Sequence, residues 1–501
     1  MAAHSSSPSE PSLAPTSSGS ELRALLLLAG PNIMAHLAET MLSLVDFAIV
    51  SQLGPEAQAA VSSGAMVFFS GFAFLIGLLF CVTTMVSQSL GANRLGDCGA
   101  YAWQGIWLSL LFGGVGVVMW PLVPAIFQLI NHEHAVQQME VSYTRIRFLS
   151  IGAAGAAIAI GNYFNGIHRP HINTISVVAA NVINGVLSYA LVLGAWGLPA
   201  LGVAGAAIGT LIASLLRLLF LIIAMCMGAD ARRYETSTHW QFDLRKTKRL
   251  LKIGVPSGAA LTSDITGWAA FLAGIIGMFG TIHLAATATC WRFTELSFMP
   301  ALGIGAAVTT MVGKAIGEGN RPLARRRARL GTQLNMVYMG CMGLVYVLFG
   351  EALIDVFSDE PAVITLGAEI LIFVAVFQVF DAVGLTYGHA LRGAGDTTWP
   401  AVVGAVECWG IMILGSLWIA HARPELESRG PWAMATLYVL ILGGTLWLRW
   451  RSTAWEGIDA IGRDDPPLPP IEPGVPEHGI ADTALASGQT PASDAIGSTP
   501  H

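Results

Sequence analysis

Apolar runs long enough to cross a lipid bilayer recur through most of this chain. Hydrophobic residues make up 54% of the 501 residues and charged residues only 12%, a balance that water-soluble domains do not show. The 56 glycines suit closely packed membrane helices better than a strand-built barrel. Because about 20 apolar residues span a bilayer, we predict an all-α polytopic membrane protein with twelve transmembrane helices. The helices are expected at residues 24–53, 62–90, 100–129, 138–167, 172–194, 201–228, 251–279, 284–316, 329–352, 361–392, 398–420 and 432–449.

The distribution of basic residues predicts the orientation of the helices. Lys and Arg cluster at residues 229–252 and 314–329, whereas most loops on the other side hold neither, with Arg423 and Arg429 as exceptions. Loops rich in Lys and Arg stay in the cytoplasm. Since the number of helices is even, both termini are expected in the cytoplasm, with the chain in the cell (inner) membrane.

An internal repeat divides the chain into two halves. Gly280 follows Gly54 by 226 positions (280 − 54), and Gly317 follows Gly91 by the same interval (317 − 91). Two homologous six-helix lobes are therefore expected, with substrate and ion sites within or between them. The expected parts are a disordered segment 1–23, lobes 24–228 and 251–450, a basic cytoplasmic linker 229–250, and a disordered polar tail 451–501.

Acidic residues inside the apolar runs are the main functional candidates. An ionised carboxylate at the centre of a membrane helix costs about 2.5–3.5 kcal/mol, so it usually faces a polar cavity. Glu39 and Asp46, in the apolar stretch 31–54, are about two helical turns apart and are expected to point to one compartment. The other acids of this kind are Asp264, Glu295, Asp381 and Glu407.

Structural roles are weighed beside these functional ones. Arg292 and Glu295 are three residues apart, which favours an ion pair within one helix. Glu407 fits a protonated or interhelically bonded acid as well as a transport role. Five polar residues fit either ion binding or interhelical hydrogen bonding: Asn162, Asn165, Asn181, Asn184 and Ser188.

Other classes of function find little support. The net charge of −6 and the lack of a basic surface exclude a nucleic-acid partner, and the six isolated cysteines form neither a zinc motif nor a disulfide framework. The sequence contains no phosphate-binding glycine loop of the kind that an ATP-driven pump requires. GAGD at 393–396 has the form of an intramembrane aspartyl hydrolase motif, with Asp381 as its conceivable partner, but the YD pair of that chemistry is missing.

Three ordered motifs then point to one family. The eighth apolar run contains RFTELSFMPALGIGAA at 292–307, and the tenth contains FQVFDAVGLTYGHALRGAGDTTWP at 377–400. The first run supplies Pro31, Asp46, Val50, Leu53 and Gly54. Over residues 24–450 the chain resembles the multidrug and toxic compound extrusion (MATE) transporters, in their bacterial NorM-like branch. This resemblance sets the hydrolase alternative aside.

The resemblance implies a fold and an activity. It implies two six-helix lobes in a V and a secondary transporter, not an enzyme, that exports small organic cations in exchange for Na⁺ or H⁺ by alternating access. No cofactor beyond the coupling ion and no obligate protein partner are expected, so the chain is expected to act as a monomer in the lipid bilayer. A flippase or exporter for a lipid-linked or secreted product is the alternative, although its only clear mid-span cation is Arg292, apart from Arg145, Arg147 and Arg217 near span ends.

The resemblance also implies roles for individual residues. Asp46 and Asn184 match the acid and the fifth-helix Asn of the first lobe. Ser188 stands where many relatives have Asp or Asn, and Glu39 is expected to replace the missing oxygen. Asp264 and Asp381 match the acids of the second lobe and are the Na⁺ candidates. The supporting residues for substrate or ion binding are Asn162, Asn165, Asn181, Asn184, Ser188, Glu295 and Gln378.

Overall fold

The computed structural model describes residues 18–130 and 132–462. Within these residues twelve helices are long and apolar enough to cross a membrane, and no strand occurs. The all-α polytopic prediction is confirmed. Helices are favoured here because each satisfies its own backbone hydrogen bonds where no water is available.

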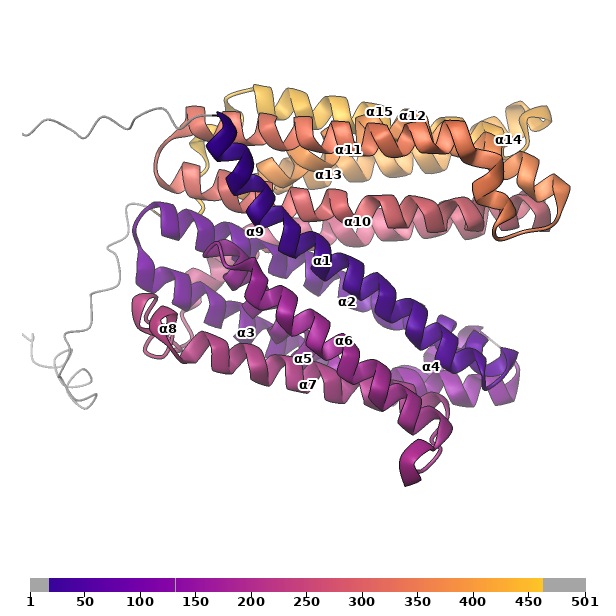
Figure 1. The fold of residues 1–501 in the computed structure, drawn as a ribbon, viewed down its shortest axis with the longest axis horizontal. Coiled ribbons are helices and arrows are strands. Elements are labelled where there is room, and N and C mark those ends of the chain that lie inside the picture. Colours follow the sequence, from indigo (N-terminus) through magenta and orange to yellow (C-terminus); the bar gives the residue numbers. More distant parts are fainter. Residues whose placement is uncertain (1–17, 131, 463–501) are drawn as a thin grey trace, which may run out of the picture. The chain divides into compact units, whose positions relative to one another are not determined.

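The membrane-length helices follow one another with short connections (Figure 1). In the first half they are α1 (Ser18–Ser51), α2 (Pro55–Gly91), α3 (Leu95–Met119) with its continuation η1 (Trp120–Leu122) and α4 (Val123–Ile130), α5 (His134–Gly166), α6 (Pro170–Leu193) and α7 (Val203–Cys226). In the second half they are α9 (Leu244–Ala269) with η3 (Ala270–Ile275) and η4 (Ile276–Phe279), α10 (Thr281–Gly317), α11 (Arg321–Asp355), α12 (Pro361–Ala394), α13 (Thr398–Glu407) with η5 (Cys408–Leu414) and α14 (Gly415–Ala422), and α15 (Arg429–Arg451). The short elements are η2 (Ala195–Gly197), α8 (Ala229–Arg233), η6 (Pro424–Leu426) and η7 (Ala454–Gly457).

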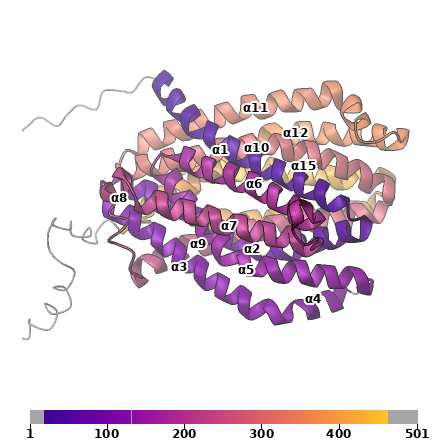
Figure 2. The ribbon, with the colours of Figure 1, turned by 60° about the horizontal axis from the view of Figure 1, so that its bottom comes forward.

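The described helices form two bundles with separate apolar cores. The first bundle, α2–α7, is centred on residues such as Leu75, Leu79 and Tyr163, and the second, α10–α15 together with η3, on residues such as Phe271 and Trp432. Helix α1 runs between the bundles and packs on both α6 and α10 (Figure 1). Helix α9 likewise packs on α2 as well as on α13. The turned view places α3 and α4 at the edge of the first bundle (Figure 2).

The internal repeat is visible in the helix boundaries. Helices α2 and α10 begin and end 226 residues apart, and so do the starts of α1 and α9 and of α3 and α11. The turns before α2 and α10 contain Gly54 at φ 100° and Gly280 at φ 97°, a conformation that glycine adopts without steric cost. The glycines that revealed the repeat therefore occupy equivalent backbone positions.

The two halves meet closely where α2 and α10 end, which we call the basic end because the basic loops lie there. A Cβ atom on Gly91 would lie 2.1 Å from the Lys314 carbonyl oxygen, and one on Gly317 would lie 2.1 Å from the Gln88 carbonyl oxygen. The Gln88 amide also donates to the Gly393 carbonyl of α12 at 2.8 Å. The backbones of the two halves thus touch at the basic end.

Ion pairs reinforce this closure. Buried Asp97 of α3 accepts from Lys246 of α9 at 2.8 Å and lies 2.6 Å from Arg94. Glu21 of α1 lies 2.9 Å from Arg327 of α11. The first helix of each half therefore begins against a helix of the other half.

These contacts move the boundaries expected from the sequence. Helix α1 begins at Ser18, inside the segment 1–23 that was expected to be disordered, because Glu21 is buried against Arg327. Helix α9 begins at Leu244, inside the expected linker 229–250, where Asp243 caps its first backbone amides. The remainder of the expected disorder, at 1–17 and 463–501, lies outside the described residues.

Residues 452–462, part of the expected disordered tail, form an ordered segment that we call the C-terminal strap. Its Trp455 is 1% exposed and stacks on Trp450 at 4.3 Å, while Glu456 pairs with Arg325 of α11 at 2.5 Å. Further along, Ala460 and Ile461 are buried in the core of the first bundle, and the Gly462 carbonyl accepts from Arg94 at 2.8 Å. The strap therefore links the second bundle to the first at the basic end.

Candidate functional site

Asp46 of α1 is held by the amide of Asn184 on α6. The Asn184 Nδ2 atom donates to both carboxylate oxygens of Asp46 at 3.1 Å. Ser188, one turn along α6, lies beside the same carboxylate. The Asn184 Oδ1 and Ser188 Oγ atoms are buried and make no hydrogen bond within the described part of the chain. The structure thus gathers the predicted residues Asp46, Asn184 and Ser188.

Glu39 lies in a different environment from Asp46. Its side chain is 51% exposed and lies 3.6 Å from the Nδ1 atom of His36. Among the described residues Glu39 and Asp46 form no hydrogen bond with each other, and the two positions are about 10 Å apart along the helix axis. The structure therefore does not place Glu39 where its carboxylate could replace the oxygen ligand that an Asp or Asn at position 188 would provide.

Two arginines from other helices compensate the acids of the first half. Arg147 of α5 acts electrostatically on Asp46 and stacks over Phe68 at 4.1 Å. Arg217 of α7 acts on Glu39, and its guanidinium donates to an amide oxygen on α6 at 3.2 Å. Among the described ion pairs neither arginine approaches its acid within 4 Å, so the compensation is through space. The sequence indicates both arginines as cations near span ends, but it does not show that they neighbour these acids, because they are distant along the chain.

In the second half, Asp264 of α9 and Asp381 of α12 lie close enough to repel each other electrostatically. The Tyr438 hydroxyl of α15 donates to Asp264 at 3.3 Å. Among the described residues no basic side chain is a significant influence on either acid. Nor do three or more His, Cys, Asp or Glu side chains gather at one point in the described ranges. The second half thus holds a pair of uncompensated acids.

Two of the supporting polar residues, Asn162 and Gln378, join neighbouring helices. The Asn162 amide donates to the Leu79 carbonyl at 3.0 Å, and Asn162 and Asn165 lie some 15 residues beyond Arg147, about 22 Å along α5. The Gln378 amide donates to Ser297 at 2.7 Å. Asn181 has a buried Nδ2 atom without a partner in the described part. The Asn162 and Gln378 hydrogen bonds thus link helices, whereas Asn181 lies one turn from Asn184 on α6.

The two remaining acids also differ from each other. Glu407 is buried and accepts from Thr445 of α15 at 3.4 Å, which fits the interhelically bonded alternative. Glu295 makes no ion pair with Arg292 within 4 Å in the described chain, so the expected pair is absent. Both side chains instead line a cavity of about 360 Å³ between α1 and α10.

This interbundle cavity lies nearer the end opposite the basic end. Its lining includes Phe47 of α1 and Trp291 of α10 beside Arg292 and Glu295. An aromatic, apolar lining with few charged groups is typical of sites for small organic molecules. The interbundle cavity thus lies toward the end opposite the closed basic end.

Known proteins similar to this chain share its length and architecture. A protein named "Probable multidrug resistance protein NorM" from Mesorhizobium japonicum is 30% identical over 86% of this chain and 93% of its own. "Multidrug resistance protein PmpM" from Pseudomonas aeruginosa is 29% identical over 78% of this chain and 82% of its own.

The comparison with solved structures shows the same fold. An outward-facing multidrug resistance MATE family transporter of the MOP superfamily matches with a TM-score of 0.78 at 21% identity, covering 87% of this chain and 97% of its own. The MatE family model matches residues 31–190 and 265–418, more than half of the chain. The chain therefore belongs to the MatE family and is a multi-pass membrane transporter of the multidrug and toxic compound extrusion class.

Proposed function

We propose that this protein exports small organic cations across the inner membrane in exchange for Na⁺ or H⁺. The observation that carries the proposal is the pair Asp264 and Asp381, two acids that repel each other and on which no basic side chain of the described residues acts. Two such carboxylates in a membrane cannot both stay ionised without a bound cation or proton. The pair therefore supplies a site that a coupling ion fills and empties.

Antiport follows from competition for these acids. A coupling ion that binds from outside lowers the affinity for a cationic drug, and by linkage the drug lowers the affinity for the ion. A proton needs only one acid, whereas Na⁺ needs several oxygens, for which the Tyr438 hydroxyl and neighbouring carbonyls are available. In this scheme the protein works as a single chain with both termini in the cytoplasm.

The interbundle cavity supports a flat cationic cargo. Phe47 and Trp291 supply aromatic side chains to this cavity of about 360 Å³, and Glu295 supplies a carboxylate that forms no ion pair with the neighbouring Arg292 within the described residues. Cations bind over aromatic faces with about 0.5–2 kcal/mol each. In the proposed cycle the cavity exchanges cargo on the side opposite the basic end, and the basic end opens to receive it.

The test is ethidium export by reconstituted vesicles under an imposed Na⁺ or pH gradient. We expect Asp264→Asn and Asp381→Asn to lose gradient-driven export and Asp46→Asn to reduce it. The matched control is Glu407→Gln, an acid within a span that is already bonded to Thr445 and should keep export. Unchanged export in both Asp46→Asn and Asp381→Asn would falsify the proposal. Movement of a labelled lipid-linked anion without ethidium transport would favour the flippase alternative.

A further inference from the structure

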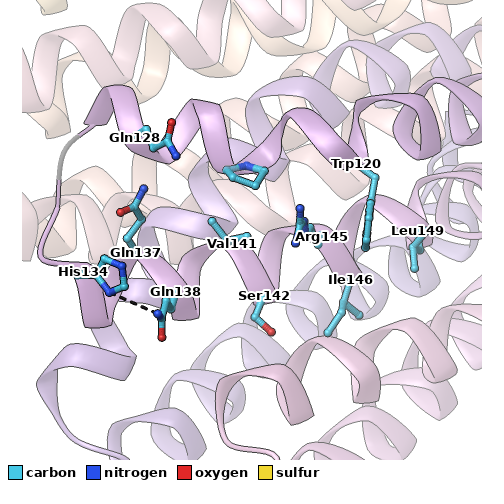
Figure 3. Close-up of a pocket in the computed structure, with 11 residues that line it drawn as sticks. Trp120, Gln128, His134, Gln137, Gln138, Val141, Ser142, Arg145, Ile146 and Leu149 are labelled. Atoms are coloured by element: carbon cyan, nitrogen blue, oxygen red, sulfur yellow. Dashed lines mark hydrogen bonds between the residues drawn. The ribbon is translucent and has the colours of Figure 1, made fainter.

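A second cavity lies on the outer edge of the first bundle, away from the acids. It has a volume of about 540 Å³ and opens between α5 and the η1–α4 segment. Figure 3 shows Arg145 and Trp120 side by side in this groove, with Gln128 and Gln137 nearer its polar end. We call it the α4–α5 groove.

Arg145 has no acidic partner among the described residues. Its guanidinium lies over the Trp120 ring at 4.4 Å, and its buried Nε atom makes no hydrogen bond with any described residue. No carboxylate lines the α4–α5 groove. By contrast, Arg94, Arg327 and Arg449 each have a carboxylate oxygen at 2.6–2.9 Å. The groove thus offers positive charge that the protein itself does not neutralise.

The position of Arg145 along α5 corresponds to a membrane interface. The 33 residues of α5 span about 50 Å, about 20 Å more than the hydrocarbon core of a bilayer. If the excess is shared equally, residue 145 lies about 6 Å inside the hydrocarbon edge, within reach of the headgroup layer for a long arginine side chain. Tryptophan is enriched at the same level.

The polarity of the groove changes along its length. Its polar end carries neutral hydrogen-bond donors, Gln128 and Gln137, and Ser142 lies next to Arg145. Deeper along α5 the lining becomes apolar at Ile146 and at Leu149, which is 46% exposed. This order of polar donors, one cation and apolar wall matches the headgroup, phosphate and acyl chain of a phospholipid.

We propose that the α4–α5 groove is a binding site for an anionic phospholipid of the leaflet opposite the basic end. Arginine pairs with phosphate oxygens through two parallel charge-assisted hydrogen bonds, which satisfies the unpartnered guanidinium. The amides donate to the remaining headgroup oxygens, and the acyl chain covers Ile146 and Leu149. A free anion would leave these apolar side chains uncovered, so the arrangement favours a lipid. The site is independent of the ion-coupling proposal.

The test is native mass spectrometry of the purified protein titrated with phosphatidylglycerol, with inorganic phosphate as a competitor. We expect Arg145→Gln to weaken phosphatidylglycerol binding about tenfold or more, as loss of a charged hydrogen bond does. Arg145→Lys should retain most of the affinity. Arg423→Gln is the matched control, because Arg423 is 69% exposed in a loop at the same end of the bundle and should bind as wild type does.

Two further measurements keep the outcome decisive. Gln137→Glu leaves Arg145 in place but adds a negative charge to the groove, so it should also weaken binding without loss of folding. Equal affinity of wild type, Arg145→Gln and Gln137→Glu for phosphatidylglycerol overturns the proposal. Displacement of the lipid by millimolar inorganic phosphate also overturns it, because the site would then recognise a free anion.

Discussion

Trp455 is expected to be the residue that fastens the C-terminal strap, and Trp455→Ala tests this. Its ring is 1% exposed and stacks face to face on Trp450 at 4.3 Å. Its Nε1 atom donates to the Trp450 carbonyl at 2.8 Å. Since the strap also reaches Arg94 of the first half, losing its anchor should loosen the closure of the basic end.

The expected magnitude follows from burial. Removing a packed tryptophan side chain costs about 3–5 kcal/mol, which includes a stacking contribution of about 0.5–1.5 kcal/mol. Glu456→Gln, in contrast, removes a partly exposed ion pair with Arg325, worth less than about 1 kcal/mol. Since about 1.4 kcal/mol is a factor of ten in an equilibrium, strap release should rise at least tenfold in Trp455→Ala and little in Glu456→Gln.

Native cysteines provide the assay. Cys81 of α2 is fully buried and lies beside Arg392 and Ser257 of the second half, so it becomes accessible only when the halves separate. Labelling by a membrane-impermeant maleimide, quantified peptide by peptide, should be at least tenfold faster in Trp455→Ala. Cys290, fully buried in the core of the second bundle, should remain unlabelled and reports global unfolding.

Two outcomes would refute this reasoning. If Trp455→Ala labels at the wild-type rate, the strap does not restrain the basic end. If Cys81 and Cys290 become reactive together, the substitution unfolds the protein and the strap has no separate role. Glu456→Gln serves as the control, because it alters the same segment with a small energetic effect.

Three further predictions concern stability and use thermal unfolding of the purified protein. Gly317→Ala places a Cβ atom 2.1 Å from a backbone carbonyl of α2 and should cost at least about 1–3 kcal/mol; Gly444→Ala, with no atom within 4 Å, should be neutral, and equal effects would contradict the packing argument. Asp97→Asn leaves Lys246 and a neighbouring arginine unpaired and should cost about 3–5 kcal/mol; a loss below 1 kcal/mol would show that the pair is solvated. Burial and two nearby basic side chains lower the pKa of His168, between α5 and α6, from 6.5 to about 3. Below pH 6.5 the unfolded chain takes up a proton on this imidazole that the folded chain does not. The free energy of unfolding should therefore decrease as the pH is lowered, by up to about 1.4 kcal/mol per pH unit. His168→Asn should remove this slope.

Sequence patterns predict the helices and the repeat well because both are encoded locally. A membrane helix needs only a long apolar run, and Gly54 and Gly280 mark turns whose backbone requires a positive φ. Gly91 and Gly317 are more informative still, since their backbones touch across the halves. Even so, the pattern alone could not show that two glycines 226 residues apart are in contact.

The features that the sequence could not predict depend on contacts between distant segments. The strap opens the polar tail 451–501, whose composition predicts disorder, yet Trp455 and Ile461 are buried in the cores of different bundles. The Arg292–Glu295 ion pair is geometrically possible within a helix, but both side chains face the interbundle cavity instead. Helical spacing establishes that two residues share a face, whereas their partners depend on what packs against that face.

The repeat preserves the backbone of the two halves but not the positions of their acidic residues, and this difference affects where a coupling ion binds. The position equivalent to Asp46 in the second half (46 plus 226) is Leu272, which lines the interbundle cavity. Asp46 therefore has no counterpart by symmetry, and its charge already faces Arg147. No basic side chain in the described part of the chain acts in this way on Asp264 or Asp381, so a coupling ion gains more by binding them than by binding Asp46. Neutralising Asp381 should consequently abolish dependence on the ion gradient, whereas neutralising Asp46 should leave that dependence measurable while lowering the rate of export.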